Sequence, residues 1–434
     1  MRAEWLEQLD PVAVHGRIAQ ATGIVLEGYG PATSIGELCE VSREDGSAPL
    51  TAEVVGFRGD RIMLMPLGDT RGIGPGSRLT MKGRSASAPV GQGLLGRVID
   101  GLGNPLDDKG PIAPEALYPL YQVPLNPLDR SRIAKPLDVG IRAINAMLTC
   151  GLGQKVGIFA GAGVGKSVLL GMLSRNVTTD VSVIALIGER GREVKEFLER
   201  DLRPEGLQRT VVVVATSDQP PLVRLRGAFL ATAIAEYFRD KGRHVLLLMD
   251  SLTRFAQGQR EVGLAIGEPP TTKGYPPSVF ALLPKLLERV GTCRGSGTLT
   301  GLYTILVEGD DLADPIADSA RSILDGHIVL SRDLAARNHY PAIDVLQSTS
   351  RVMRSVISPA HDQAARQVVE MLATYQRAED LITVGAYKPG VNPKLDRAVN
   401  AHDAIQTFLR QEKDERADFA ACVAGLVQLV ERAK

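Results

Sequence analysis

The sequence predicts an α/β protein with a parallel-sheet core, a small β-barrel before the core and a helical domain after it. Three observations lead to this fold class. From about residue 150 to residue 330, apolar strand-like segments alternate with helical patterns, which is typical of a parallel sheet with helices on both faces. Before the core, short β-like segments are broken by clusters of Gly and Pro. After Pro359 the β signal disappears, and apolar residues recur at helical spacing.

Residues 1–88 are expected to form the β-barrel domain. Strand-like runs at 17–19 and 61–65 are separated by turns rich in Gly and Pro, and strands at this spacing indicate a small closed barrel. A Gly- and Pro-rich connector then leads to a helical pattern over residues 139–148.

Residues 89–357 are expected to form the central domain, and residues 358–434 the helical domain. Six apolar segments predict strands of the central sheet: 156–160, 181–187, 211–215, 245–249, 299–307 and 327–330. In the last domain, the apolar residues that predict helices are Val368, Val369, Leu372, Tyr375, Phe408, Phe419, Val423, Leu426 and Leu429. Ligands of open α/β sheets bind at the carboxyl ends of the strands, so we look for functional side chains there.

Length and composition narrow the class of protein. A chain of 434 residues is long enough for two or three domains. Fifty Lys and Arg residues balance fifty Asp and Glu residues, which argues against a protein that coats nucleic acid. We find no apolar run near the ~20 residues of a membrane span and no apolar signal-peptide segment, so we expect a cytosolic protein. The four Cys residues form no C-x-x-C pair, so neither a zinc site nor a disulfide framework is indicated.

Residues 157–167 have the pattern of a buried strand, a glycine-rich turn and a helix start, which is the arrangement of a phosphate-binding loop. Small residues let backbone N–H groups surround a triphosphate, and the helix over 166–176 adds the positive end of its dipole. Ala160 stands where such loops usually begin with glycine, and alanine fits there if its backbone is not left-handed. The pattern predicts nucleotide contacts from Gly161, Ala162, Gly163, Val164, Gly165, Lys166, Ser167 and Val168.

Within this loop, Lys166 and Ser167 have separate expected tasks. The Lys166 ammonium would reach the β- and γ-phosphates, and the Ser167 hydroxyl would bind Mg²⁺. The sequence therefore predicts a site for a nucleoside triphosphate with its magnesium ion.

Two carboxylates follow apolar strands of the same predicted sheet. Asp250 ends one of them and is expected beside Mg²⁺, although it could instead cap the helix that follows. Glu189 ends another, where a carboxylate can orient and polarise the water that attacks the γ-phosphate. The alternative for Glu189 is an ion pair with Arg190 or Arg192 at a helix start.

Several long segments resemble the catalytic subunits of the rotary ATPase superfamily, in the same order along nearly the whole chain. They are G-E-R-G-R-E at 188–193, A-E-Y-F-R-D at 235–240 and Y-P-A-I-D at 340–344. Further segments resemble the type III protein-export ATPases of bacterial flagella and injectisomes, namely 191–197, 267–280, 308–311 and 385–387. The resemblance implies a RecA-like ATPase core that binds ATP and Mg²⁺. This family also tends to carry alanine at the position of Ala160.

The resemblance implies roles for the phosphate-site residues. Lys166 and Ser167 take the places of the family's phosphate and magnesium contacts, and Asp250 takes that of its Walker-B aspartate. Glu189 takes the place of the catalytic glutamate, and Arg190 belongs to the nucleotide contacts.

Three further residues receive roles from the same resemblance. Arg351 matches the arginine that acts on the γ-phosphate of a neighbouring subunit. Tyr340 is expected to stack on adenine, and Tyr387 to complete that pocket. The alternative for each tyrosine is a buried ring with a satisfied hydroxyl.

The resemblance also implies an assembly. Because one chain carries both Glu189 and Arg351, copies of it can build complete sites, and a homohexamer is expected. The implied partners are central-stalk and stator proteins, export chaperones with their protein substrates, and an export gate at the cytoplasmic face of the inner membrane, with no nucleic acid. Residues 273–280 are expected on the inner side of the ring, and the residues through Asp10 are expected to hold neighbours together and to meet the stator.

The predicted function is an ATP-hydrolysing motor that releases chaperones from export substrates and unfolds those substrates, with a flagellar system favoured over an injectisome. One alternative is the catalytic subunit of a proton-coupled rotary ATPase, but the last domain lacks that subunit's strongly acidic run. Another is an RNA-translocating hexameric ATPase, but residues 1–88 contain only Trp5, Tyr29 and Phe57 as stacking platforms. A non-catalytic ring subunit would lack Glu189.

Overall fold

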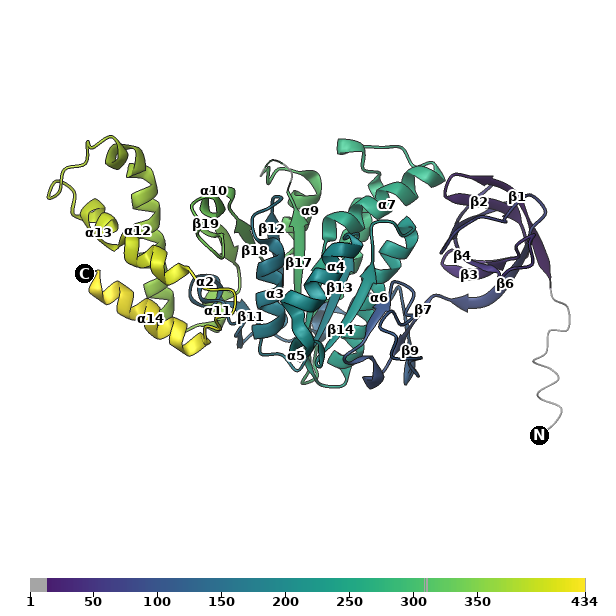
Figure 1. The fold of residues 1–434 in the computed structure, drawn as a ribbon, viewed down its shortest axis with the longest axis horizontal. Coiled ribbons are helices and arrows are strands. Elements are labelled where there is room, and N and C mark those ends of the chain that lie inside the picture. The colour runs from purple at the N-terminus through teal and green to yellow at the C-terminus, as the bar shows by residue number, and fades with distance from the viewer. Residues whose placement is uncertain (1–13, 308, 310, 434) are drawn as a thin grey trace.

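The computed structural model describes residues 14–307, 309 and 311–433 and arranges them in three consecutive parts (Figure 1). A β-barrel lies at one end, a sheet covered by helices occupies the middle, and a group of helices lies at the other end. The predicted ring contact through Asp10 lies outside the described residues, as do Glu308 and Asp310 of one quoted segment. Within the described ranges, no helix combines the length and the apolar character that a membrane span requires.

The first part is a closed barrel whose neighbouring strands pair in the order β1-β2-β5-β4-β3-β6. Its strands are β1 (His15–Thr22), β2 (Val25–Tyr29), β3 (Glu37–Val41), β4 (Leu50–Arg58), β5 (Arg61–Pro66) and β6 (Arg78–Ser85). The predicted barrel is confirmed, and inward-facing side chains such as Leu26, Val54 and Leu64 fill it. Beyond it, β7 (Ser87–Val90) pairs with β9 (Ala116–Pro119) and not with a barrel strand.

The middle part contains a sheet with the strand order β19-β18-β12-β17-β15-β13-β14-β8. All the predicted strands are present, as β12 (Lys155–Ala160), β13 (Val181–Ile187), β14 (Thr210–Ala215), β15 (His244–Asp250), β17 (Thr298–Leu306) and β18 (Gly326–Leu330). They pair in parallel, which confirms the predicted parallel core.

Two edge strands, β8 and β19, and the three short strands β10, β11 and β16 have no counterpart in the sequence pattern. The edge strand β8 (Val98–Asp100) pairs in parallel with β14 and lies inside the Gly- and Pro-rich connector. At the other edge, β19 (Ile343–Ser350) runs antiparallel to β18, and half of its residues are partly exposed, which weakens its apolar signal. The short β16 (Gly291–Thr292) runs antiparallel to β17, and β10 (Pro136–Leu137) pairs with β11 (Cys150–Gly151).

Helices connect these strands. They are α2 (Arg142–Met147), α3 (Lys166–Asn176), α4 (Gly191–Glu196), the π-helix η3 (Phe197–Leu202), α5 (Arg203–Leu207), α6 (Pro221–Asp240), α7 (Leu252–Ile266), α8 (Pro277–Leu287), α9 (Pro315–Ile323), α10 (Arg332–Ala336) and α11 (Met353–Val356). Short 3₁₀ turns are η1 (Gln92–Leu94), η2 (Pro127–Asp129) and η4 (Thr272–Gly274).

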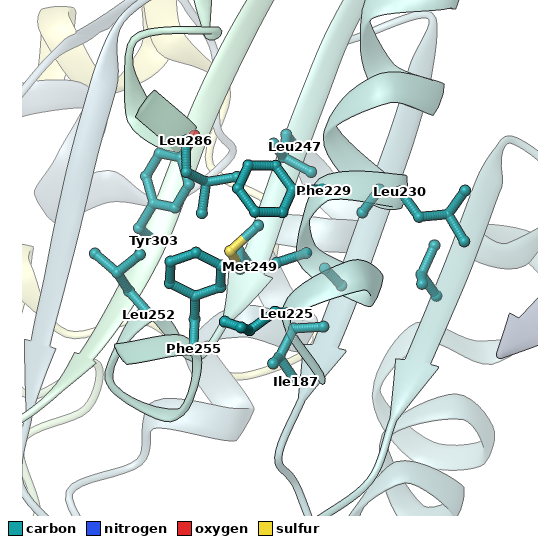
Figure 2. Close-up of a cluster of buried hydrophobic side chains, with 14 of the residues drawn as sticks. Ile187, Leu225, Phe229, Leu230, Leu247, Met249, Leu252, Phe255, Leu286 and Tyr303 are labelled. Atoms are coloured by element: carbon teal, nitrogen blue, oxygen red, sulfur yellow. The ribbon is translucent and has the colours of Figure 1, made fainter. Parts of the chain in front are cut away.

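Alternate residues of the central strands face opposite sides of the sheet, as the pleat requires. Leu247 and Met249 of β15 belong to the cluster that α6, α7 and α8 cover. Figure 2 shows this cluster, in which the rings of Phe229 and Phe255 lie close to Met249. Leu248 faces the other side and belongs to the cluster that includes α3. Because both faces are covered, the central strands are apolar throughout, and this explains why they were predictable from continuous apolar runs.

The last part consists of α12 (Pro359–Thr383), α13 (Pro393–Leu409) and α14 (Phe419–Arg432). The predicted helices are present, and Val368 of α12 and Leu426 of α14 are fully buried. Val369 also lies in α12 as the pattern predicts, but its side chain is 37% exposed, because Met371 takes the inward place three residues after Val368.

Candidate active site

The phosphate loop connects β12 to α3 at the carboxyl edge of the sheet. Gly163 and Gly165 have φ angles of 78° and 88°, in the left-handed region that favours glycine. Ala160 is the last residue of β12 and pairs with Leu306 and Leu330 in regular extended backbone. Alanine therefore fits at the start of this loop without strain.

A cleft of about 550 Å³ opens beside the loop. Besides loop residues it is lined by Gly188, Glu189, Arg190, Glu193, Ser217 and Arg254. The ends of β12 and β13 and the start of α7 therefore meet at one place, as expected for the ligand side of an open α/β sheet.

The Lys166 ammonium contacts both predicted carboxylates. Its Nζ lies 2.5 Å from Oδ1 of Asp250 and 3.4 Å from Oε1 of Glu189, and all three side chains are largely buried. Asp250 Oδ1 also accepts a hydrogen bond of 2.6 Å from the hydroxyl of Thr304, a buried residue of the neighbouring strand β17. The sequence pattern does not single out Thr304, because a threonine inside an apolar strand carries no functional signal of its own.

The charges in this cluster shift the pKa values of two groups. Burial, followed by the negative charge of Asp250, raises the pKa of Glu189 to about 7. For Lys166, burial lowers the pKa, but the attraction of Asp250 and Glu189 outweighs it and leaves the pKa raised. Lys166 therefore carries its positive charge at neutral pH, whereas Glu189 titrates near neutral pH.

The structure decides between the alternatives for both carboxylates. The cap of α7 is Ser251, whose side chain accepts the backbone N–H of Arg254, so Asp250 is not the cap. Arg190 lies 3.6 Å from Glu193, and Arg192 lies 3.0 Å from Glu196. These arginines pair with helix residues, and Glu189 faces Lys166 instead.

A second cavity, of about 380 Å³, adjoins the phosphate loop on the side of Tyr340. Tyr340 is 41% exposed, and its ring lies against Gly165, so it is not a buried tyrosine. A second part of its wall comes from the segment after α13, namely Arg410, Gln411, Glu412 and Lys413. No residue type or spacing in that segment indicates a ligand site, and the sequence pattern missed it for that reason.

Tyr387 does not line this cavity. It lies between α12 and α13, and its hydroxyl donates a hydrogen bond of 2.6 Å to Asp396. The expectation that Tyr387 completes the base pocket is therefore not met within one chain, because the bend between these helices holds the ring elsewhere.

Arg351 follows β19 and does not line the cleft of its own chain. Its Nη2 donates a hydrogen bond of 3.3 Å to the backbone carbonyl of Arg321, and the residue is exposed. Its action on a neighbouring subunit stays a prediction. The same holds for the inner-ring position of residues 273–280, where Lys273 lies 3.3 Å from Asp314.

Only two protein side chains, Ser167 and Asp250, are predicted to bind magnesium. Within the described ranges, no group of three or more His, Cys, Asp and Glu side chains could hold a metal by itself. Ser167 and Asp250 nevertheless supply a hydroxyl and a carboxylate beside the phosphate loop. This donor set fits Mg²⁺, which is usually bound by one or two protein oxygens with substrate phosphates and water.

Comparison with known proteins agrees with this geometry. Residues 140–350 match the family model for the nucleotide-binding domain of the ATP synthase alpha/beta family, and residues 18–83 match that family's beta-barrel domain. Residues 357–428 match the T3SS EscN ATPase C-terminal domain.

The chain also matches known proteins over nearly their whole length. The chain is 51% identical to the flagellum-specific ATP synthase of Bacillus subtilis, over 98% of this chain and 97% of the relative. It is 50% identical to the type 3 secretion system ATPase of Xanthomonas euvesicatoria, over 92% and 90%. The assembled ATPase EscN of the enteropathogenic E. coli type III secretion system superposes with a TM-score of 0.91 at 45% identity, covering 96% of this chain and all of that one. The phosphate loop, its paired carboxylates and these matches lead to one conclusion: the chain is an ATPase of the ATP synthase alpha/beta family and belongs to its branch of flagellar and type III secretion ATPases.

Proposed function

We propose that ATP is hydrolysed in the cleft between the phosphate loop and the ends of β13 and β15. The observation that carries this proposal is the contact of Lys166 with both Asp250 and Glu189. When a triphosphate binds with its cation, the phosphates can replace the carboxylates as partners of the Lys166 ammonium, and the cation can replace the ammonium beside the carboxylates. The backbone of residues 161–165 would hold the phosphates, and Lys166 would neutralise the γ-phosphate as charge develops on it.

Ser167 and Asp250 would hold Mg²⁺, which supplies positive charge to the β- and γ-phosphate oxygens when bound. Thr304 keeps the Asp250 carboxylate in place by its hydrogen bond of 2.6 Å. Glu189, which is ionised above neutral pH, would orient the attacking water and accept one of its protons as the water attacks. Arg190 would contact the phosphates from the cleft wall, and Tyr340 would stack on the adenine.

We also propose that copies of this chain form a homohexameric ring in which Arg351 completes the site of a neighbour. The exposed position of Arg351 outside its own cleft supports this. Two similar structures support it as well, because they are described as assembled EscN and as assembled EscN in complex with its central stalk EscO. By the same likeness, a central-stalk protein would occupy the ring axis.

The biological role we propose is that of the motor of a type III export apparatus, at the cytoplasmic face of the inner membrane. It would release chaperones from export substrates, unfold the substrates at the export gate and contact a stator. The match of residues 357–428 to the EscN ATPase C-terminal domain supports an export role over that of a proton-coupled ATP synthase. Six flagellum-specific enzymes are 45–52% identical and two secretion enzymes are 48–50% identical, so the ranges overlap, and a flagellar system is favoured only because the three highest of these identities, 51–52%, are to flagellum-specific enzymes.

Replacement of the chromosomal copy tests this role. A Lys166→Ala strain should retain the protein but lose both filament assembly and swimming, whereas the exposed Lys394→Ala should change neither. If filaments are normal in the Lys166→Ala strain and secretion through a needle complex is lost, the system is an injectisome. If neither process changes, the export role is wrong.

A further inference from the structure

The side chain of Gln411 uses both its oxygen and its nitrogen in hydrogen bonds that join the central sheet domain to the segment after α13. Its Oε1 accepts a hydrogen bond of 2.7 Å from the backbone N–H of Arg142, and its Nε2 donates to the backbone carbonyls of Gly140 at 2.9 Å and Glu415 at 2.8 Å. Its own backbone N–H donates to the carbonyl of Tyr340 at 2.9 Å. The residue is 6% exposed, so these bonds form away from solvent.

Gln411 and its partner Tyr340 both line the cavity beside the phosphate loop, whereas Gly140, Arg142 and Glu415 do not. One wall carries Gly165 and Tyr340, and the other is the segment 410–413, to which Gln411 itself belongs. The bond from Gln411 to Tyr340 joins the two walls directly. The side-chain bonds to Gly140 and to the start of α2 fix the second wall to the central domain.

A neighbouring arginine strengthens the same attachment. The Arg142 guanidinium donates to the carbonyl of Arg410 at 2.7 Å, lies over the ring of Phe408 at 6.0 Å and forms an ion pair with Glu415. Arg142 thus contacts both ends of the segment 410–415, and Gln411 attaches the same segment to Gly140 and Arg142 from within it. A segment with no helix or strand of its own is held in one conformation by these two side chains.

We propose that Gln411 is a positioning residue for the purine base: it sets the distance between the Tyr340 ring and the segment 410–413 and thereby the affinity for adenine. The inference rests on the proposed adenine subsite at Tyr340. Gln411 makes no contact with the phosphate loop among the interactions described above, so it acts on the base and not on the phosphates. Buried donors and acceptors left without partners would force this wall to shift, since a buried unpaired polar group is costly.

Gln411→Glu is the informative variant, because glutamate keeps the length and the acceptor for Arg142 but loses the Nε2 donors. A carboxylate oxygen would then face the carbonyls of Gly140 and Glu415. Gln411→Met, which has a similar length and no charge, is the second variant in case the first does not fold. Gln428→Glu, at an exposed position of α14, makes the same change of charge away from the cavity.

Calorimetric titration of the full-length chain with ADP and with inorganic tripolyphosphate, both with Mg²⁺, measures the effect. We expect at least a tenfold weaker affinity for ADP in Gln411→Glu or Gln411→Met, and an affinity for tripolyphosphate within about twofold of the wild type. In turnover assays the KM for ATP should rise by a similar factor, with kcat within about threefold. Gln428→Glu should match the wild type in every measurement.

Two outcomes overturn the inference. If a folded Gln411 variant binds ADP as the wild type does, or loses affinity for ADP and tripolyphosphate equally, Gln411 does not position the base. Failure of the proposed function would give a different result, because it would be seen in the wild type. If the wild-type chain binds ADP no better than tripolyphosphate, there is no adenine subsite at Tyr340. If the wild-type chain does not turn over ATP, there is no hydrolytic site.

Discussion

Nζ of Lys166 lies 2.5 Å from Oδ1 of Asp250, a residue 84 positions later in the chain. The contact joins the start of α3, the helix that follows β12, to the end of β15, and β17 lies between β12 and β15 in the sheet. With Glu189 also within 3.4 Å, one ammonium faces two carboxylates, so the cluster has a net negative charge when all three groups are ionised. Such a cluster favours the arrival of a cation together with the phosphates, and this is the charge balance that Mg²⁺ with ATP provides.

Glu189→Gln should lower kcat by at least about a hundredfold while the affinity for ATP stays within about threefold. The amide fills the same space but cannot draw a proton from the attacking water, and such interactions are made mainly in the transition state. Steady-state hydrolysis together with equilibrium nucleotide binding measures both quantities. Glu199→Gln, at an exposed position of η3, is the matched control and should behave as wild type. A Glu189→Gln enzyme that keeps more than about half of the wild-type rate would remove Glu189 from the mechanism.

The pKa of Glu189, raised to about 7, predicts a pH dependence of hydrolysis. The proposed role needs the carboxylate, so kcat/KM should be level well above pH 7 and should fall about tenfold per pH unit well below it. ATP titrates in a similar range, and binding of ATP to Glu189→Gln over the same pH values isolates that contribution. A flat profile between pH 6 and pH 8 would mean that Glu189 is ionised throughout, contrary to the raised pKa.

Thr304→Val should raise the Mg²⁺ concentration that half-saturates hydrolysis by about tenfold. The substitution removes the only hydroxyl described as donating to Asp250, and a hydrogen bond to a charged group contributes about 1.5–3 kcal/mol. Thr304→Ser keeps the hydroxyl and should restore most of the magnesium affinity. Thr300→Val, in the same strand but bonded to the backbone of Gly153, is the control for the loss of a buried hydroxyl. Equal magnesium dependence in Thr304→Val and Thr300→Val would contradict a role of Thr304 at the site.

The sequence predicts the central sheet well because its strands are buried on both faces. Val181–Ile187 is apolar at nearly every position, and its predicted bounds agree with those of β13. The bounds of α3 were equally predictable, since Lys166 follows the glycine turn and Val177 leaves the helical conformation. Edge elements behave differently: β8 and β19 owe their conformation to pairing with strands distant in sequence, and pairing leaves no local pattern.

The phosphate site could be predicted because loop, lysine and strand-end carboxylates lie on separate segments with strong local patterns. The base pocket could not be predicted from the sequence in the same way. Its second wall, residues 410–413, is irregular backbone whose place depends on the bonds of Gln411 to Gly140 and Tyr340, both more than seventy positions earlier in the chain. Tyr387 was assigned to that pocket from family likeness, and its bond to Asp396 holds it outside.

Mixing two inactive variants tests whether Arg351 acts on a neighbouring chain. Lys166→Ala removes the phosphate contact and Arg351→Ala removes the arginine, so rings made of either variant alone should be inactive. In mixed rings, some interfaces pair an intact phosphate loop with an intact arginine, and these should regain a measurable fraction of the wild-type rate. Wild-type activity per chain should also fall on dilution as rings dissociate, because the cleft of an isolated chain is not lined by Arg351. Lys394→Ala mixed with Lys166→Ala gives the control for simple dilution of active chains. A mixture that stays inactive, together with activity per chain that is constant on dilution, would show that Arg351 does not complete a neighbour's site.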